Sequence, residues 1–580
     1  MEQQKRSRFI IRRYRSVVGA ALVIEAVAYL VSLTDALVAG GMVSQDALTA
    51  IGLMAPFSLI ITFLSATING GTTLGFTRAS DRYDRRHANE VFSQGMLTSL
   101  AVGLLFVLCM VAVRSRILES FSVSPQVRRY LGEYYDLITL YYVFMPLNAV
   151  LDNIVLNDGG EKISTVANVV QTCGNILLSL LFSGFWGVRG IALASGISQI
   201  LACLILCFWF QKKKCTLKIL WYFNLKEELK LSLEGGIRSV FFVACAGMVW
   251  AINGLALKRF DSDMVATLVV VEKLRDSATV FMGLSLAIQP LIGTLREEGN
   301  TKAERYLLHT AGTVVLISGF VVSLLFIAGA PLLMRVFGLN TPSLVTLGTT
   351  AIRITGMTIV FMALLMFFFI HHYLTGEKAP ALLICILGWF VVPVGLVVLF
   401  DAIMGTPVGI WIGIALAPVV SLLLYAVISL LFRKKIHSMF RLHRGDDGIR
   451  IFEFPLRDEN IAEMAETAGQ ILKEAGYSGR LQNFAQVITE EVLELIHEHN
   501  RDAEKELSVE YTIIQDREGV RLVFRDEGSV FDVTDTDANV ESFRQYVVSR
   551  ILTCPKYSRH VMATGYNRNE FYLEEQRNGR

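Results

Sequence analysis

The chain has 580 residues, of which 53% are hydrophobic and only 18% are charged, and its mean hydropathy is +0.49. A composition this apolar excludes a single soluble domain of that length and is typical of a polytopic membrane protein. The net charge of +2 divides unevenly, because residues 1–440 carry +11 and residues 441–580 carry −9. Since the basic residues flank apolar runs and the water-soluble part is acidic, we expect a lipid bilayer as partner and no nucleic acid.

A membrane-spanning helix needs about 20 apolar residues. Runs of this kind follow one another along residues 1–435, beginning near residues 16, 48, 92, 130, 163, 187, 235, 264, 307, 346, 380 and 406. The basic segment 5–15 precedes the first run and no small-residue cleavage site follows it, so we expect an anchor that is kept and not a removed signal peptide. Most Lys and Arg residues lie in connections on the same side as this segment, although Arg114, Arg116, Arg128 and Arg129 go against the trend. The positive-inside rule therefore predicts a multi-pass protein of the cell (plasma) membrane with both termini in the cytoplasm.

The two halves of the apolar region repeat each other. Four short matches recur in order, at offsets of 218, 217, 216 and 223 residues: Gly75–Arg78 with Gly293–Arg296, Val143–Met145 with Val360–Met362, Gly160–Lys162 with Gly376–Lys378, and Gly190–Ala194 with Gly413–Ala417. The predicted fold is a polytopic all-α membrane protein with 12 transmembrane helices in two parallel six-helix repeats, 1–220 and 221–435. Such repeats enclose a central cavity and alternately open it to each side of the membrane. The alternative without transport is a twelve-helix receptor or scaffold.

Ionisable side chains inside the apolar runs mark candidate sites, because a charge within a membrane is costly and is usually kept for ion or substrate binding. Asp35 lies some twenty residues into the first run, and Glu272 and Asp276 lie four residues apart in the eighth, with Lys273 and Arg275 between them. Glu272 and Asp276 share a helix face. They predict a carboxylate site for a cationic substrate or a proton, or else a self-neutralised cluster near the membrane edge. Asp35 could likewise be a helix-end residue at the outer face.

Leu33–Gly40 followed by Asp46–Gly52, together with Ile288–Gly293 and Glu298–Arg305, resembles the multidrug and toxic compound extrusion (MATE) transporters over about 435 residues. The resemblance implies secondary antiport, in which a small organic, often cationic, compound leaves while Na+ or H+ enters, with no required cofactor. The same superfamily includes flippases of lipid-linked saccharides, which a fold cannot separate from drug exporters.

The resemblance also implies an ion-coupling site, in which Asp35 joins Asn175, Ser179 and Ser195 from the fifth and sixth helices. Ser179 stands where that family usually has a second carboxylate, so a sodium site here would have one fewer anionic ligand. This departure favours proton coupling or a weakened sodium site and leaves the coupling ion open. The eight cysteines form no CxxC pair and have no histidine at a zinc spacing, so no metal centre is certain.

A linker at 436–449 leads into a soluble domain at 450–580. Arg450–Phe454 alternates as a strand, residues 462–476 and 481–499 have helical periodicity, and residues 507–514 and 520–524 alternate as a hairpin. The pattern predicts a soluble α+β sandwich.

Within this domain, Val523–Asp532 preceded by Thr489–Val492 resembles the anti-sigma-factor-like branch of the GHKL (histidine-kinase-like) ATPases. The resemblance implies that Asp526 and Gly528 recognise adenine and that Glu491 positions the attacking water. Leu495 replaces the family's Mg2+-binding asparagine, and residues 541–545 replace its glycine-rich lid. We therefore expect a degenerate regulatory domain with weak binding of ATP or another nucleotide, no enzymatic activity, and a possible cytoplasmic regulatory protein as partner. A membrane-anchored signalling protein with a GHKL kinase output is the alternative from another functional class.

Overall fold

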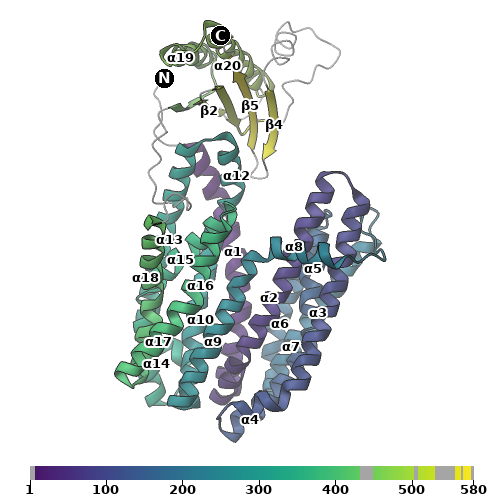
Figure 1. Cartoon of the computed structure of the whole chain (residues 1–580), viewed down its shortest axis with the longest axis vertical. Helices are drawn as coiled ribbons and strands as arrows, with labels where there is room; N and C mark the ends of the chain where they lie inside the picture. Colours follow the sequence, from purple (N-terminus) through teal and green to yellow (C-terminus); the bar gives the residue numbers. More distant parts are fainter. Residues whose placement is uncertain are drawn as a thin grey trace. The chain divides into compact units, whose positions relative to one another are not determined.

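The computed structural model describes residues 7–431, 448–501, 507–516, 518–529, 556–562 and 566–575 (Figure 1). Residues 541–545, which stand in place of the family's glycine-rich lid, and most of the predicted linker, 436–447, lie outside these residues. The part of the chain before residue 432 is almost entirely helical, and the part after residue 447 contains all the described strands.

The first half contains seven α-helices and two short irregular helices. They are α1 (Arg8–Val38), η1 (Ala39–Val43), α2 (Gln45–Asp81), α3 (Arg85–Ser120), α4 (Pro125–Tyr141), α5 (Phe144–Asn157), α6 (Glu161–Trp186), α7 (Val188–Cys207) and η2 (Phe208–Gln211). Local capping sets several starts: the side chains of Ser44, Asp84 and Ser124 accept a hydrogen bond from a first-turn amide of α2, α3 and α4.

The second half follows the same plan with more breaks. Its helices are α8 (Leu225–Gly235), η3 (Gly236–Ser239), α9 (Val240–Arg259), α10 (Ser262–Asp276), η4 (Ser277–Val280), α11 (Phe281–Leu286), α12 (Gln289–Glu298), α13 (Thr301–Val336), α14 (Pro342–Gly356), α15 (Ile359–Leu374), α16 (Lys378–Ile386), η5 (Leu387–Val391), α17 (Val392–Met404) and α18 (Pro407–Leu431).

The helix bounds repeat between the halves, as the sequence predicts. α2, α3 and α4 begin at Gln45, Arg85 and Pro125, while α10, α13 and α14 begin at Ser262, Thr301 and Pro342, which is 216 or 217 residues later in each case. The break between α4 and α5 corresponds to the break between α14 and α15. The repeat is therefore present in the helices as well as in the short sequence matches.

Ten of the described helical segments are long and apolar enough to cross a membrane, and the number rises to twelve if two bent pairs each form one span. The first pair, Ser262–Leu286 with Gln289–Glu298, bends by 41°, and the second, Pro342–Gly356 with Ile359–Leu374, bends by 48°. Large apolar side chains are exposed along these helices, for instance Leu105 and Leu108 on α3 at 61% and 66%. Exposed leucines in such rows suit contact with lipid, not with water.

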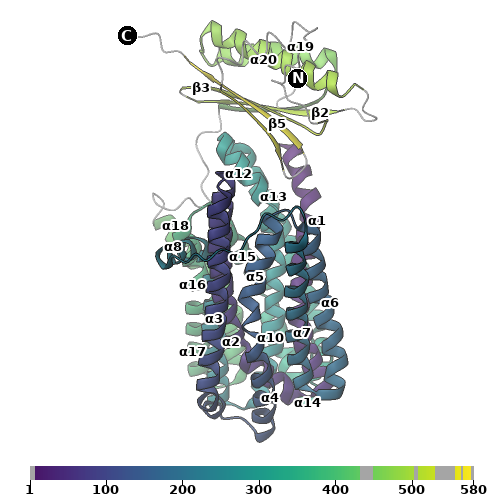
Figure 2. The same ribbon diagram turned by 90° about the vertical axis from the view of Figure 1, so that its right-hand side faces the viewer.

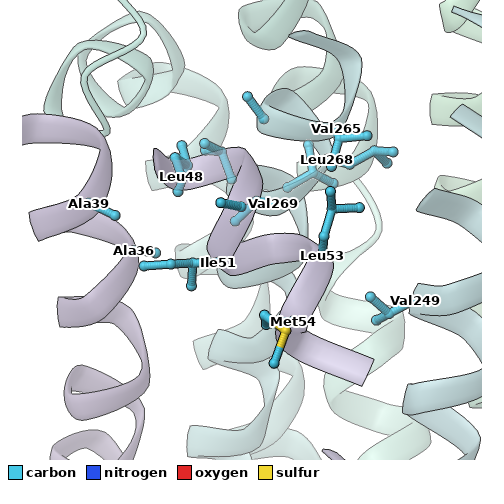
Figure 3. Close-up of a cluster of buried hydrophobic side chains, with 14 of the residues drawn as sticks. Ala36, Ala39, Leu48, Ile51, Leu53, Met54, Val249, Val265, Leu268 and Val269 are labelled. Atoms are coloured by element: carbon cyan, nitrogen blue, oxygen red, sulfur yellow. The ribbon is translucent and has the colours of Figure 1, made fainter. Parts of the chain in front are cut away.

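The largest core joins the two halves. Figure 3 shows Ala36 and Ala39 of α1 and η1 and the first turns of α2 beside Val265, Leu268 and Val269 of α10. Packing here is close: a Cβ on Gly40 would lie 2.0 Å from the carbonyl oxygen of Phe337, at the end of α13. Only glycine allows the two backbones to approach this far.

The C-terminal part is a five-stranded antiparallel sheet with two helices on one face (Figure 2). The strands are β1 (Ile449–Pro455), β2 (Ser508–Gln515), β3 (Gly519–Asp526), β4 (Lys556–Met562) and β5 (Tyr566–Glu574), in the order β1-β2-β3-β5-β4. The helices α19 (Asp458–Glu474) and α20 (Gly479–His499) bury their apolar faces against alternate residues of the sheet, such as Tyr511, Leu522 and Phe571. Both predicted helices and the hairpin are confirmed, with bounds shifted by a few residues.

The chain divides into two compact units. One contains residues 1–21, 284–313 and 438–580, and the other contains residues 22–283 and 314–437. Two segments of the helical region thus share one unit with the C-terminal domain. The division into two lobes, a linker and a C-terminal domain stays a prediction.

Candidate functional site

Asp35 lies near the end of α1, just before the π-helical turn η1. It is half-buried, and its two carboxylate oxygens accept hydrogen bonds from different helices. Ser179 Oγ of α6 donates to Asp35 Oδ1 at 3.4 Å, and Ser195 Oγ of α7 donates to Asp35 Oδ2 at 3.3 Å. Asp35 thus lies near a helix end, as the alternative reading has it, and also contacts two other helices.

Asn175 completes the cluster. It lies one turn before Ser179 on α6, so both side chains lie on the same face of the helix, and its Nδ2 donates to Ser195 Oγ at 2.9 Å. Asn175 is 5% exposed, and within the described residues its Oδ1 has no hydrogen-bond partner. The structure thus brings together all four side chains that the resemblance implied, while their role as an ion site stays a prediction.

A cation from the second half lies close to this cluster. Lys273 Nζ of α10 donates to Ser32 Oγ of α1 at 2.8 Å, and Tyr29 OH donates to the carbonyl oxygen of Lys273 at 3.0 Å. Ser32 lies one helical turn before Asp35, and the ammonium group interacts electrostatically with that carboxylate. Sequence analysis found Lys273 among the charged residues of the eighth apolar run. The residues around it in the sequence do not indicate that it contacts the first helix.

The two carboxylates predicted for the second half differ in their surroundings. Glu272 is half-buried, and its Oε1 has no hydrogen-bond partner among the residues that the structure describes. Asp276 ends α10, and its side chain is 53% exposed with Lys273 Nζ at 3.9 Å from Oδ2. Arg275 is buried beside Met248 Sδ at 3.8 Å. The two carboxylates are neighbours on one helix, but Asp276 is exposed whereas Glu272 has a buried oxygen.

The comparison with known proteins bears on the membrane part. Residues 20–181 match the MatE family model. A solved structure described as the inward-facing conformation of a multidrug resistance MATE family transporter of the MOP superfamily is 21% identical, covers 70% of this chain and 95% of its own, and superposes with a TM-score of 0.64. The membrane part has the fold of MATE transporters.

Other solved structures agree with the MATE fold. One described as the outward-facing conformation of such a transporter is 20% identical over 73% of this chain and 96% of its own, with a TM-score of 0.58. A MOP superfamily transporter from Pyrococcus furiosus gives the same four values, and its pocket of reversed polarity is said to suggest a different function. No curated protein matches the sequence. Since the match accounts for nearly all of each solved chain, this protein carries more than the MATE fold.

The residues that the GHKL resemblance singles out lie in the C-terminal domain. Asp526 ends β3 and is fully buried, and its Oδ1 accepts hydrogen bonds from Gly528 N at 2.9 Å and from Asn567 Nδ2 at 2.8 Å. A Cβ on Gly528 would lie 2.5 Å from Asn500 Oδ1, at the end of α20. Asp526 and Gly528 therefore form a closed turn in which one carboxylate oxygen already binds protein groups.

Glu491 lies on α20, nine residues before Asn500. At 1.5 Å per residue, about 13 Å of helix separates it from the end where Gly528 packs. Leu495, at the position of the missing Mg2+ ligand, is buried in the apolar core. Across the described part of the chain, no group of three His, Cys, Asp or Glu side chains could hold a metal ion. The assignment of these residues to a nucleotide site remains untested.

Proposed function

We propose that the protein is a secondary antiporter of the cell membrane that exports small organic compounds in exchange for H+ or Na+, with Asp35 as the coupling carboxylate. The observation that supports this best is the cluster of Asp35, Asn175, Ser179 and Ser195, which joins three helices of a MATE fold inside the membrane region. A carboxylate held there among neutral hydroxyl groups can gain and lose a cation or a proton during each transport cycle.

The chemistry of the cluster favours the proton. A sodium ion prefers several oxygen ligands, and Asp35 supplies the only carboxylate, with neutral oxygens from Asn175 and the two serines. Ser179 stands where a second carboxylate would strengthen a sodium site. One proton on Asp35 needs none of these additional ligands. Asn175 Oδ1, which has no hydrogen-bond partner among the described residues, could be a ligand for sodium. A weak sodium site is therefore the second possibility.

Lys273 supplies a counter-charge when Asp35 is ionised. Its ammonium group reaches α1 from the second half of the chain, one turn from Asp35. A proton or ion that neutralises Asp35 would weaken this attraction across the halves, because the Coulomb energy between the two groups depends on both charges. Ion binding would in this way bias how the halves pack, as coupled transport requires.

The substrate is proposed to be cationic or amphipathic. Glu272 presents an unpartnered, buried oxygen within the described part of the second half, and a carboxylate in such a place attracts organic cations. The binding pocket of the Pyrococcus furiosus transporter is described as having reversed polarity, which suggests a different function for that protein. One fold can therefore serve different functions. A flippase of lipid-linked saccharides would need a basic cavity to bind pyrophosphate. The Lys and Arg residues of the first-half helices instead lie near the helix ends, for instance Arg78, Arg116 and Arg189.

The experiment is efflux from inverted membrane vesicles under an imposed pH or Na+ gradient. We expect Asp35→Asn to reduce gradient-driven efflux at least about a hundredfold, because an amide can neither release a proton nor balance a cation. Asp136→Asn is the matched control, since among the described residues Asp136 pairs with Arg114 at an exposed position. Transport by the Asp35→Asn protein at the wild-type rate would remove Asp35 from the mechanism.

For the C-terminal domain we propose a regulatory role with weak, Mg2+-independent nucleotide binding and no hydrolysis. Leu495 offers no metal ligand, and Asp526 already shares one oxygen with Asn567. Calorimetry with ATP and phosphate release by the purified full chain measure the two expectations. Robust Mg2+-dependent turnover that is lost in Glu491→Ala would favour the signalling-kinase alternative instead.

A further inference from the structure

The sheet of the C-terminal domain is buried on both faces. Side chains alternate along a strand, so Tyr511, Phe524 and Phe571 point toward α19 and α20, and their neighbours point to the opposite face. The residues on that opposite face are also buried, at 0 to 8% exposure: Glu510, Arg525, Tyr566, Arg568 and Glu570. We call these five residues the docking face. A charged sheet face that is withdrawn from water must have something covering it.

Part of the cover is the end of α12. Glu298, the last residue of that helix, is 1% exposed and accepts hydrogen bonds from both Arg525 and Arg568, with 2.7 Å between its Oε1 and Arg568 Nε. These arginines are direct partners across β3 and β5, so one carboxylate bridges two adjacent guanidinium groups. Arg525 also donates to Glu510 Oε1 at 2.6 Å. Without Glu298, Arg525 would keep Glu510 and Arg568 would keep Glu570, but the two buried guanidinium groups would have one carboxylate fewer between them, which is unfavourable.

The start of α1 provides the rest of the cover. Phe9 is fully buried and packs edge-on against Tyr566, with 5.3 Å between the ring centroids. Ser7 donates to Glu510, and Arg13 pairs with Glu527 at 3.0 Å. Glu527 lies inside the Asp526–Gly528 turn, so the N-terminal segment contacts the motif that sequence reasoning singled out for nucleotide recognition.

The two covering segments come from different halves of the MATE fold. α1 continues to Asp35 in the first half, and α12 leads into α13 in the second half. We propose that the docking face is an intramolecular clamp: it binds the start of α1 and the end of α12 at once and so holds the two halves in one relative arrangement. The contact between the docking face and the two segments does not depend on the proposed transport activity. Its effect on transport rests on the proposed function.

The clamp predicts a specific change in hydrogen exchange of the purified full chain. Glu298→Gln should increase the exchange of amides in residues 8–14 and 289–298 about tenfold or more, because local opening no longer has to break the buried ion pairs. Glu297→Gln is the matched control: it removes the same charge one residue away, where the side chain is exposed. Arg521 contacts Glu297 through the backbone carbonyl oxygen, which this substitution keeps. Equal exchange in the two variants would overturn the clamp.

A second pair of variants covers the case in which Glu298→Gln does not fold. Arg13→Gln and Glu527→Gln break a partly exposed ion pair and should each loosen residues 8–14 severalfold, with a combined effect smaller than the sum of the two. Efflux is then measured on the same proteins. Loosened segments with unchanged transport would overturn the regulatory effect alone. Absence of transport in the wild type would overturn the proposed function, while the exchange data would still decide whether the docking face binds both segments.

Discussion

At the scale of single residues, charged groups in the helical region are held by polar neighbours from other helices. Asp35 is bonded by two serines, and Lys273 donates to Ser32 on a helix more than two hundred residues away in sequence. Glu272 differs, because one of its oxygens is buried without a partner among the described residues. A buried acceptor that is left unsatisfied is costly unless a ligand uses it.

This difference predicts unequal effects of two similar substitutions in the eighth span. Glu272→Gln should lower the apparent affinity for a cationic substrate about tenfold, equivalent to about 1.4 kcal/mol, because it removes a buried negative charge. Asp276→Asn should have a smaller effect, since Asp276 is half-exposed beside Lys273. Efflux per molecule of expressed protein is the measurement. If both variants express poorly but transport normally per molecule, the cluster serves structure only.

At the scale of elements, interruptions of regular helix lie near the candidate sites. The π-helical turn η1 follows Asp35 within four residues, and α10 gives way to a 3-10 turn directly after Asp276. Such irregular turns are common where a helix must present a functional group or bend. The close contact between Gly40 and Phe337 lies at η1 as well, so the first and second halves meet beside the Asp35 cluster.

A methyl group at Gly40 should disturb this contact. A Cβ there would lie 2.0 Å from the Phe337 carbonyl oxygen, so Gly40→Ala should destabilise the present packing of the halves by about 1–3 kcal/mol. Hydrogen exchange of residues 334–339 should rise accordingly. Gly19→Ala is the control on the preceding helix α1, where a Cβ would meet nothing within 4 Å. Equal exchange in the two proteins would show that the contact has room to adjust.

At the scale of the whole molecule, a MATE fold is joined to a domain that shares one compact unit with two segments of the helical region. A domain attached in this way can favour one arrangement of the halves only by as much as it binds that arrangement more tightly. Its removal should therefore change the transport equilibrium without removing the ion site.

Deletion of residues 445–580 is predicted to change the rate or regulation of efflux severalfold and to leave gradient-driven transport in place. The deletion also removes Tyr566, against which the buried Phe9 packs, so the comparison requires equal amounts of folded protein in the vesicles. A truncated protein that is folded but completely inactive would show that the domain belongs to the transport machinery itself.

The sequence by itself determined the features that depend on local pattern. Runs of apolar residues predicted the spans, matches at a constant offset predicted the repeated helix bounds, and alternation predicted the hairpin of β2 and β3. The resemblance also named Asp35, Asn175, Ser179 and Ser195, and the structure places them together. Each of these inferences needs only neighbouring residues or a shared motif, because helix and strand periodicities are properties of short segments.

Only the tertiary structure decided which distant charges meet. Glu298 accepts from Arg525 and Arg568, 227 and 270 residues later, and Lys273 lies 241 residues from Ser32. In sequence, Glu298 is one of several charges in a connection between spans, and Arg525 alternates with apolar residues as a solvent-facing strand residue would. The neighbouring residues in the sequence do not distinguish a charged side chain at the surface from a buried one. Its burial depends on whether a distant segment of the chain packs over it.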